Sequence, residues 1–169
     1  SGDFAGALAR YEGATIARVD PDGSVHVAAT GMRFPNGSVI TPDGRTMVVA
    51  ESMARRLTAF DVAVDGSLTN QRVWAQFDDV VPDGICLDDE GAIWVADAAH
   101  ARCVRARMGG EIVAEVATQD RCFACMLGGD DGRTLFMVTA EHSHHAKASV
   151  TRSGRILTTR VDAAHAGRP

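Results

Sequence analysis

The fold is decided by FPNGSVITPDGRTMVVAE, the stretch at residues 34–51, because it recurs twice further along the chain. The second copy is VPDGICLDDEGAIWVAD at residues 81–97, and the third is ACMLGGDDGRTLFMVTAE at residues 124–141. Each copy reads as a short apolar strand, a polar turn that contains glycine, a second apolar strand and a terminal acidic residue. The acidic residues that end the copies lie 46 and 44 residues apart.

Two more strands follow each of the first two copies, at residues 56–61 and 72–75 and at residues 103–106 and 111–116. The Asp-Gly and Gly-Gly dipeptides between these strands are typical of tight hairpins. Four short antiparallel strands at a period near 45 are the signature of a β-propeller blade. The sequence therefore predicts an all-β fold made of four-stranded antiparallel blades.

We interpret residues 1–169 as one partial β-propeller domain of about three to three and a half blades. The blade repeats lie near residues 34–75, 81–117 and 124–162, and residues 15–29 form the outer hairpin of a preceding blade. Propellers close with four to eight blades. The chain also begins with a serine, so we expect N-terminal blades outside this sequence, or a second chain, to close the ring.

Composition excludes several classes of protein. Lys and Arg number 17 against 22 Asp and Glu, a formal charge of −5, and no basic run suggests a nucleic-acid partner. No apolar stretch approaches the length of a membrane span, and residues 1–12 lack the pattern of a secretory signal. We therefore expect a protein without nucleic-acid or membrane partners and with a cytoplasmic location.

The four cysteines are Cys86, Cys103, Cys122 and Cys125. Their number is small for a chain of this length, which does not indicate a disulfide scaffold. Cys122 and Cys125 form a C-x-x-C pair, but a zinc site would need a second pair at matching spacing. We predict four reduced thiols in the core, without zinc.

The tripeptide Pro-Asp-Gly occurs in two different contexts. At residues 21–23 and 42–44 it lies between strands, where it is typical of a hairpin turn. At residues 82–84 it lies ahead of the first strand of a repeat and aligns with Pro35-Asn36-Gly37. In a propeller the first strand is the innermost, so Asn36 and Asp83 should project oxygen atoms toward one axial point, although two ordinary entry turns would give the same pattern.

These motifs together resemble the SMP-30/gluconolactonase family of regucalcin-like lactonases, over about residues 15 to 162. The resemblance is carried by Pro35-Asn36-Gly37, residues 41–51, Arg56-Leu57, Phe60-Asp61, residues 70–73, Pro82-Asp83-Gly84, residues 87–91, 93–96, 125–129 and 133–139.

The resemblance implies a six-bladed propeller that holds one divalent metal ion and hydrolyses sugar lactones and related cyclic esters. It implies that Asn36 and Asp83 are metal ligands and that Asp83 is also the general base. The family's acidic ligand near the start of the full-length chain has no match here, and Glu12 lacks the family context around it. The substrate-contacting Arg and Asn of the family have no match either.

The residue types suit this chemistry. Calcium prefers oxygen ligands, which Asn36 and Asp83 supply, and Zn²⁺, Mn²⁺ or Mg²⁺ are the alternatives. A metal ion polarises a lactone carbonyl, and a carboxylate beside it can take a proton from water. No Gly-x-Ser-x-Gly motif supports a serine hydrolase.

Several other residues invite a functional reading. His100 follows the second copy and could contact substrate at the mouth of the channel. We interpret residues 142–153, which include the end of the EHSHH stretch at 141–145, as a solvated polar loop. Glu51 and Asp97 are expected far from the inner-strand entries, as turn or cap residues. Trp74 and Trp94 are expected to pack between blades.

The sequence thus predicts a metal-dependent lactone hydrolase of the gluconolactonase type, with the possibility that this stretch alone is inactive. Two alternatives stay open at this point. One is a non-catalytic propeller segment used for binding or assembly, and the other is a propeller of the strictosidine-synthase-like group. The pair Asn36 and Asp83 favours the lactonase, and the unmatched glutamate speaks against it.

Overall fold

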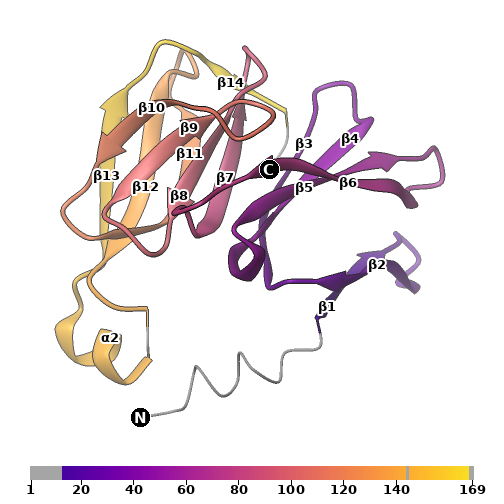
Figure 1. Ribbon diagram of the computed structural model, residues 1–169, viewed down its shortest axis with the longest axis horizontal. Coiled ribbons are helices and arrows are strands. Elements are labelled where there is room, and N and C mark those ends of the chain that lie inside the picture. The colour runs from indigo at the N-terminus through magenta and orange to yellow at the C-terminus, as the bar shows by residue number, and fades with distance from the viewer. Residues whose placement is uncertain (1–12, 144, 168–169) are drawn as a thin grey trace.

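The first repeat folds into a four-stranded antiparallel sheet whose strand order follows the sequence. A computed structural model describes residues 13–143 and 145–167 (Figure 1). The strands of this sheet are β3 (Pro35–Ile40), β4 (Thr46–Glu51), β5 (Arg56–Val62) and β6 (Leu68–Gln76), with a 3-10 turn, η1 (Ser52–Ala54), between β4 and β5. Gly44 adopts a φ of 71° in the first hairpin, which explains why this turn needs glycine.

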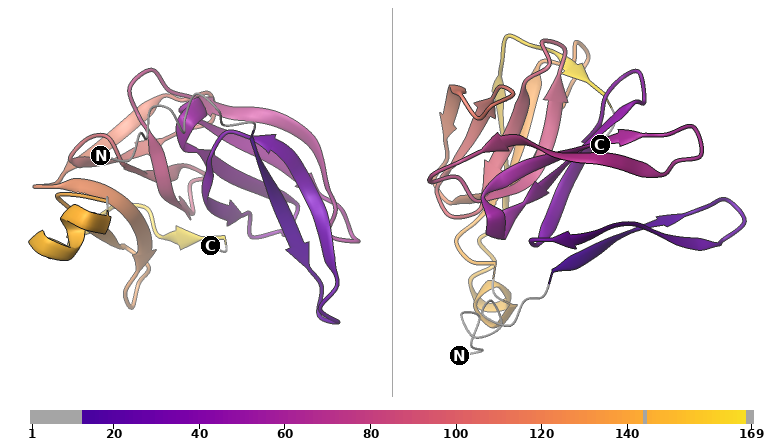
Figure 2. Two further views of the ribbon diagram at one scale, coloured as in Figure 1. Left: turned by 90° about the horizontal axis from the view of Figure 1, so that it is seen from below. Right: turned by 45° about the vertical axis from the view of Figure 1, so that its right-hand side comes forward.

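The second and third repeats form two further antiparallel sheets that fan out beside the first (Figure 2). The second contains β7 (Pro82–Asp88), β8 (Ile93–Asp97), β9 (Arg102–Ala106) and β10 (Ile112–Ala117). The third contains β11 (Arg121–Gly128), β12 (Thr134–Ala140) and β13 (Arg155–Arg160). A separate hairpin of β1 (Ala14–Val19) and β2 (Val25–Met32) precedes them, close to the predicted residues 15–29. The all-β prediction is therefore confirmed, while the number of blades in a closed ring stays a prediction.

Two predictions were wrong in detail, that every blade has four strands and that residues 142–153 form a loop. A short strand, β14 (His165–Ala166), pairs with β7, so the second sheet has five strands and the third has three within the described residues. Residues 142–153 contain a helix, α2 (His145–Thr151), because the run His-Ala-Lys-Ala-Ser favours helix locally. The described residues contain no helix long and apolar enough to cross a membrane.

The core consists of layers between neighbouring sheets. The layer between the first and second sheets contains Leu57, Trp74 and Ile93, and the layer between the second and third contains Trp94, Leu135 and the four cysteines. Both tryptophans are buried, as predicted. The alternation of apolar side chains along these strands places them on the faces that meet.

Glycine residues allow the first strands of the three repeats, β3, β7 and β11, to approach one another closely. A Cβ atom on Gly37 would lie 2.6 Å from the main-chain nitrogen of Ile85, and one on Gly84 would lie 2.7 Å from the Cα atom of Ala124. Neither glycine has a positive φ. The glycines of Pro35-Asn36-Gly37 and Pro82-Asp83-Gly84 are therefore required by packing, unlike the turn glycines of the other Pro-Asp-Gly sites.

The substitution Gly84→Ala should lower the free energy of unfolding by about 1–3 kcal/mol, because the new methyl group meets main-chain atoms of β11. The matched control is Gly154→Ala, since no atom lies within 4 Å of a Cβ placed there. Urea unfolding of both variants measures the difference. Equal stabilities of the two variants would contradict the close approach of β7 and β11.

The four cysteines are free and buried, as predicted, and the absence of zinc stays a prediction. The Sγ atoms of Cys86 and Cys125 lie 4.0 Å apart. Hydrogen bonds among the thiols, together with burial, raise the pKa of Cys86, Cys103 and Cys125 well above its ordinary value. The reactive thiolate form is therefore scarce in the folded protein.

A thiol reagent such as DTNB should consequently leave the native chain almost unlabelled at pH 8 and titrate four thiols after denaturation. The change in absorbance during the DTNB reaction, followed with and without guanidinium chloride, measures how many thiols react and how fast. Rapid labelling of the native chain would show that the layer between the second and third sheets is open.

Candidate active site

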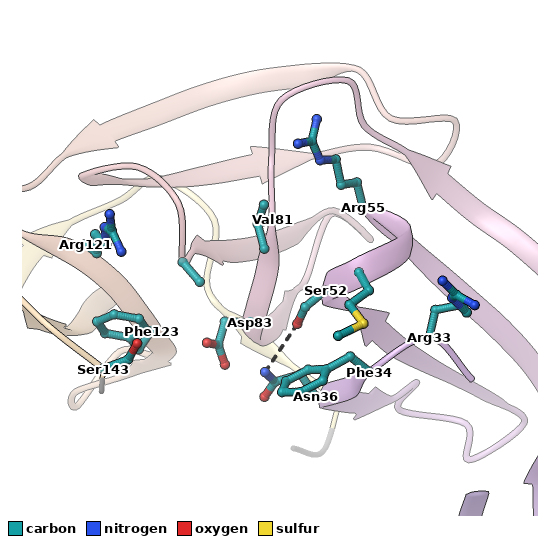
Figure 3. Close-up of a pocket in the computed structure, with 12 residues that line it drawn as sticks. Arg33, Phe34, Asn36, Ser52, Arg55, Val81, Asp83, Arg121, Phe123 and Ser143 are labelled. Atoms are coloured by element: carbon teal, nitrogen blue, oxygen red, sulfur yellow. Dashed lines mark hydrogen bonds between the residues drawn. The ribbon is translucent and has the colours of Figure 1, made fainter. Parts of the chain in front are cut away.

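A pocket of about 610 Å³ lies where the inner strands of the three sheets begin (Figure 3). Asn36 enters it from β3, Asp83 from β7 and Phe123 from β11. The close approach of Gly37 to Gly84 and of Gly84 to Ala124 places these three side chains side by side on neighbouring inner strands. The structure thus brings Asn36 and Asp83 together in one pocket and adds an aromatic side chain from the third repeat.

Asp83 is a half-buried carboxylate without a cationic partner in the described part of the chain. Burial raises its pKa from 3.8 to about 6, and a hydrogen bond with the Asn36 side chain opposes this rise. Among residues 13–143 and 145–167, no Lys, Arg or His side chain forms an ion pair with it. A desolvated carboxylate of this kind attracts a proton or a metal ion.

Ser52 connects the two inner-strand entries. The Nδ2 atom of Asn36 lies 3.4 Å from the hydroxyl oxygen of Ser52 as a hydrogen-bond donor, and this hydroxyl donates to the main-chain oxygen of Pro82 at 2.7 Å (Figure 3). The chain from Asn36 through Ser52 to Pro82 spans the first and second sheets. It fixes the Asn36 amide beside Asp83.

The prediction that Glu51 and Asp97 lie far from the inner-strand entries was wrong. In an antiparallel hairpin the end of the second strand lies beside the start of the first, so Glu51 pairs with Pro35 and Asp97 pairs with Pro82. The main-chain N–H of Arg33 donates to Glu51, and that of Val81 donates to Asp97. Both carboxylates are fully buried and hold the segments that lead into Asn36 and Asp83.

The electrostatic state of these two carboxylates is opposite to that of Asp83. Burial alone would raise the pKa of Glu51, but hydrogen bonds from Arg56, the Arg33 N–H and Thr58 bring it below its ordinary value. Burial acts in the same way on Asp97, and bonds from Arg102 and His100 outweigh it and lower its pKa. Both side chains are therefore ionised and satisfied structural anchors.

The other two Pro-Asp-Gly aspartates are turn residues, as predicted. Asp22 accepts hydrogen bonds from the main chain and hydroxyl of Ser24, at 2.9 and 2.7 Å. Asp43 accepts them from the hydroxyl of Thr41 at 2.6 Å and the N–H of Arg45 at 3.0 Å. Neither aspartate lines the pocket that contains Asp83.

The histidines contribute little to this pocket. His100 is exposed, and its Nδ1 atom lies 2.8 Å from Asp97, outside the lining among the described residues. His142 lies 3.2 Å from Glu141, and the neighbouring Ser143 reaches the pocket instead. His144 and Glu12 lie outside the described residues. A contact of His100 with substrate stays a prediction.

Sequence reasoning missed three arginines and two aromatic residues that line the pocket: Arg33, Arg55, Arg121, Phe34 and Phe123. Phe123 was missed because the third copy of the repeat was taken to begin at Ala124, although Phe123 precedes Ala124 as Asn36 and Asp83 precede Gly37 and Gly84. The arginines lie in segments that flank the strands. No periodic pattern marks such positions.

The donor set fits a hard divalent cation. Asn36 and Asp83 present amide and carboxylate oxygens, and the charge of Asp83 is not balanced by a protein cation in the described part of the chain. No group of three or more His, Cys, Asp or Glu side chains among these residues is arranged to hold a metal ion. A bound cation would therefore take most of its ligands from water or from groups beyond these two side chains.

Comparison with known proteins identifies relatives. The family model described as SMP-30/Gluconolactonase/LRE-like region matches residues 3–141. Regucalcin of Danio rerio is 29% identical over 140 residues, which cover 80% of this chain and 48% of that protein. A 6-deoxy-6-sulfogluconolactonase of Pseudomonas putida is 24% identical over 163 residues, which cover 93% of this chain and 56% of that protein. The chain thus spans about half the length of these curated relatives.

A solved structure shows the same fold. The calcium-binding protein regucalcin from Agrobacterium tumefaciens superposes with a TM-score of 0.75 at 20% identity, over 94% of this chain and 56% of that one. The neighbour is of the propeller type, in agreement with the sheets described above.

The raised pKa of Asp83 has a consequence for stability. Because the folded state binds the proton more tightly than the unfolded state, ionisation of Asp83 destabilises the fold above pH 6, and the cost disappears as the pH falls toward 4. With metal removed by a chelator, Asp83→Asn should raise the free energy of unfolding at pH 7.5 by about 1–2 kcal/mol, after allowance for partial exposure.

Urea unfolding at pH 7.5 and pH 4 measures this effect, and the difference between variant and wild type should shrink at the lower pH. Asp43→Asn is the matched control, because bonds from Thr41 and Arg45 lower the pKa of Asp43. A loss of stability in Asp83→Asn at pH 7.5 would show that the carboxylate is better satisfied than described.

Proposed function

Because the chain belongs to the SMP-30/gluconolactonase/LRE-like family, we propose that its pocket serves the hydrolysis of sugar lactones or related cyclic esters. The observation that carries this proposal is the half-buried Asp83 carboxylate, which has a raised pKa and lies beside Asn36 without a cationic partner in the described chain. The name of the Pseudomonas putida relative, a sulfogluconolactonase, supports the substrate class.

In the proposed reaction Asp83 acts as the general base. Its carboxylate takes a proton from a water molecule while the water oxygen adds to the lactone carbonyl carbon. The carbon–oxygen bond of the ring then breaks, and the proton held by Asp83 passes to the departing ring oxygen. The product is the open hydroxy acid. A pKa of about 6 suits this role, because the carboxylate is ionised at neutral pH and is a stronger base than an ordinary aspartate.

Asn36 and Ser52 orient the groups around this base. The Asn36 amide opposes the rise in the pKa of Asp83, and Ser52 holds this amide against the entry of β7. Phe123 offers an apolar surface on the opposite side of the pocket, which suits the carbon face of a sugar ring.

We propose that one divalent metal ion, calcium first, binds to the oxygen atoms of Asn36 and Asp83, with Zn²⁺, Mn²⁺ or Mg²⁺ as the alternatives. When bound, such an ion supplies Lewis-acid stabilisation of the negative charge that develops on the carbonyl oxygen. The calcium-binding neighbour from Agrobacterium tumefaciens supports the choice of calcium. Further ligands would come from blades beyond this chain or from a second chain that closes the ring.

Substitution of Asp83 by Ala should reduce kcat/KM for a small aldonolactone by roughly 10²–10⁴-fold, because it removes the proposed base and a ligand together. Asn36→Asp should retain part of the metal binding, since an oxygen ligand remains. Hydrolysis followed in a pH-stat, with and without added calcium, measures both effects on protein made from the complete reading frame.

The matched control is Asp43→Ala, which removes the same residue from the same tripeptide in a hairpin turn outside the pocket. Its activity should equal that of the wild type. Unchanged turnover in Asp83→Ala would refute the proposed base and favour a propeller that binds ligands without catalysis.

A further inference from the structure

The pocket has a local charge that differs from that of the whole chain. The chain carries a formal charge of −5, yet the residues that line the pocket include one carboxylate, Asp83, and two arginines, Arg55 and Arg121, that form no ion pair with a carboxylate of the described residues. A cation bound by Asp83 would make the pocket still more positive. This surplus of positive charge at a concave site favours an anionic ligand.

Most other arginines of the described chain are bound to carboxylates. Ion pairs within 4 Å are formed by Arg18, Arg56, Arg72, Arg102, Arg105, Arg107, Arg155 and Arg160. Arg55 and Arg121 form no such pair with any carboxylate in residues 13–143 and 145–167. Two arginines that form no ion pair with a carboxylate of the described residues therefore belong to the lining of the pocket.

The two groups lie on either side of Asp83. Arg55 follows η1 in the first sheet, and Arg121 begins β11 in the third sheet, while Asp83 lies on β7 between them (Figure 3). The guanidinium of Arg55 is held in place by a 2.6 Å bond from Nη1 to the main-chain oxygen of Asp78. This hydrogen bond uses one of the five N–H donors of the guanidinium group. Because the acceptor is an uncharged main-chain carbonyl, the positive charge of Arg55 is not neutralised.

The backbone supports a specific role for Arg55. It has a φ of 51° and a ψ of 45° at the end of η1, a left-handed conformation in which glycine would be relaxed. Phe34, which also lines the pocket, has a φ of 61°. Two of the four described non-glycine residues with positive φ therefore line this pocket. Unfavourable backbone conformations of this kind are concentrated at the functional sites of proteins.

We infer that the substrate is an anionic lactone, one that carries a carboxylate, phosphate or sulfonate group apart from the ring, and that Arg121 binds this group while Arg55 adds positive charge on the other side of Asp83. The inference rests on the proposed function, because the lactone ring must lie at Asp83. Guanidinium groups match the oxygen atoms of such anions with paired hydrogen bonds. Asp83 and Asn36 then act on the ring, while the arginines select the substrate.

The test compares lactones that differ in charge, with protein made from the complete reading frame. The substrates are glucono-δ-lactone, 6-phosphogluconolactone and a glucarolactone, which are neutral, phosphorylated and carboxylated. We expect kcat/KM to be about 10- to 100-fold higher for at least one of the anionic substrates, and this preference to fall by a similar factor in Arg121→Met. Arg121→Lys should retain part of it.

The control is Arg45→Met, which removes an exposed arginine from the β3–β4 turn outside the pocket and should leave the preference unchanged. Arg55→Met provides a second variant at the site. A wild-type preference near one, or a preference that neither Arg121→Met nor Arg55→Met reduces, would overturn the inference.

A binding measurement separates this inference from the proposed function. Calorimetry with 6-phosphogluconate, glucarate and gluconate needs no turnover, and we expect one of the first two acids, each of which carries a second anionic group, to bind at least about tenfold more tightly than gluconate. Preferential binding that Arg121→Met abolishes, without hydrolysis of any lactone, would uphold the anion site and refute the lactonase. Hydrolysis without any preference would refute the anion site and leave the lactonase intact.

Discussion

An ion pair between a fully buried carboxylate and an arginine on the next strand fixes the geometry on which the pocket depends. Glu51 bonds to Arg56 at 2.7 Å, and Asp97 bonds to Arg102 at 2.9 Å. Each carboxylate also accepts a main-chain N–H from the segment that leads into the inner strand. Removal of one partner from such a pair costs about 3–5 kcal/mol, because a charge stays buried without compensation. The repeat therefore uses its last acidic residue to hold its own first strand in place.

Asp83 differs from these two buried carboxylates in its charge balance. Its neighbours Glu51 and Asp97 have their charges balanced and their pKa lowered, whereas the pKa of Asp83 is raised by burial. The same sheets therefore contain carboxylates that stabilise the fold and one that does not. A charged side chain without a partner, beside others whose charges are balanced, is typical of a functional site, where a protein has lower stability because its activity requires that group.

The sequence analysis succeeded where periodicity and turn chemistry act, and it failed where contacts join segments far apart. Alternating apolar strands at a constant period made the sheets predictable, and the roles of Asp22 and Asp43 followed from local turn preferences. The pairing of β14 with β7 involves two residues and carries no pattern of its own. The anchoring role of Glu51 was missed because only its place at the end of the second strand was considered. The antiparallel hairpin brings that end back beside the start of the first strand. Asn36 and Asp83 were found together because the repeats align at the start of their inner strands.

The third repeat differs from the other two, and because of this difference the two sides of the pocket are chemically unlike. Where the first two repeats place Asn36 and Asp83, the third places Phe123, and its terminal acid Glu141 is exposed instead of buried. At this position the third sheet offers no side-chain oxygen to a cation held by Asn36 and Asp83. It presents an aromatic face and the Arg121 guanidinium instead. The side of the pocket formed by the first two sheets is therefore polar, whereas the side formed by the third is aromatic and cationic. In the proposed function this asymmetry orients a sugar lactone, with its carbonyl toward Asp83 and its negative group toward Arg121.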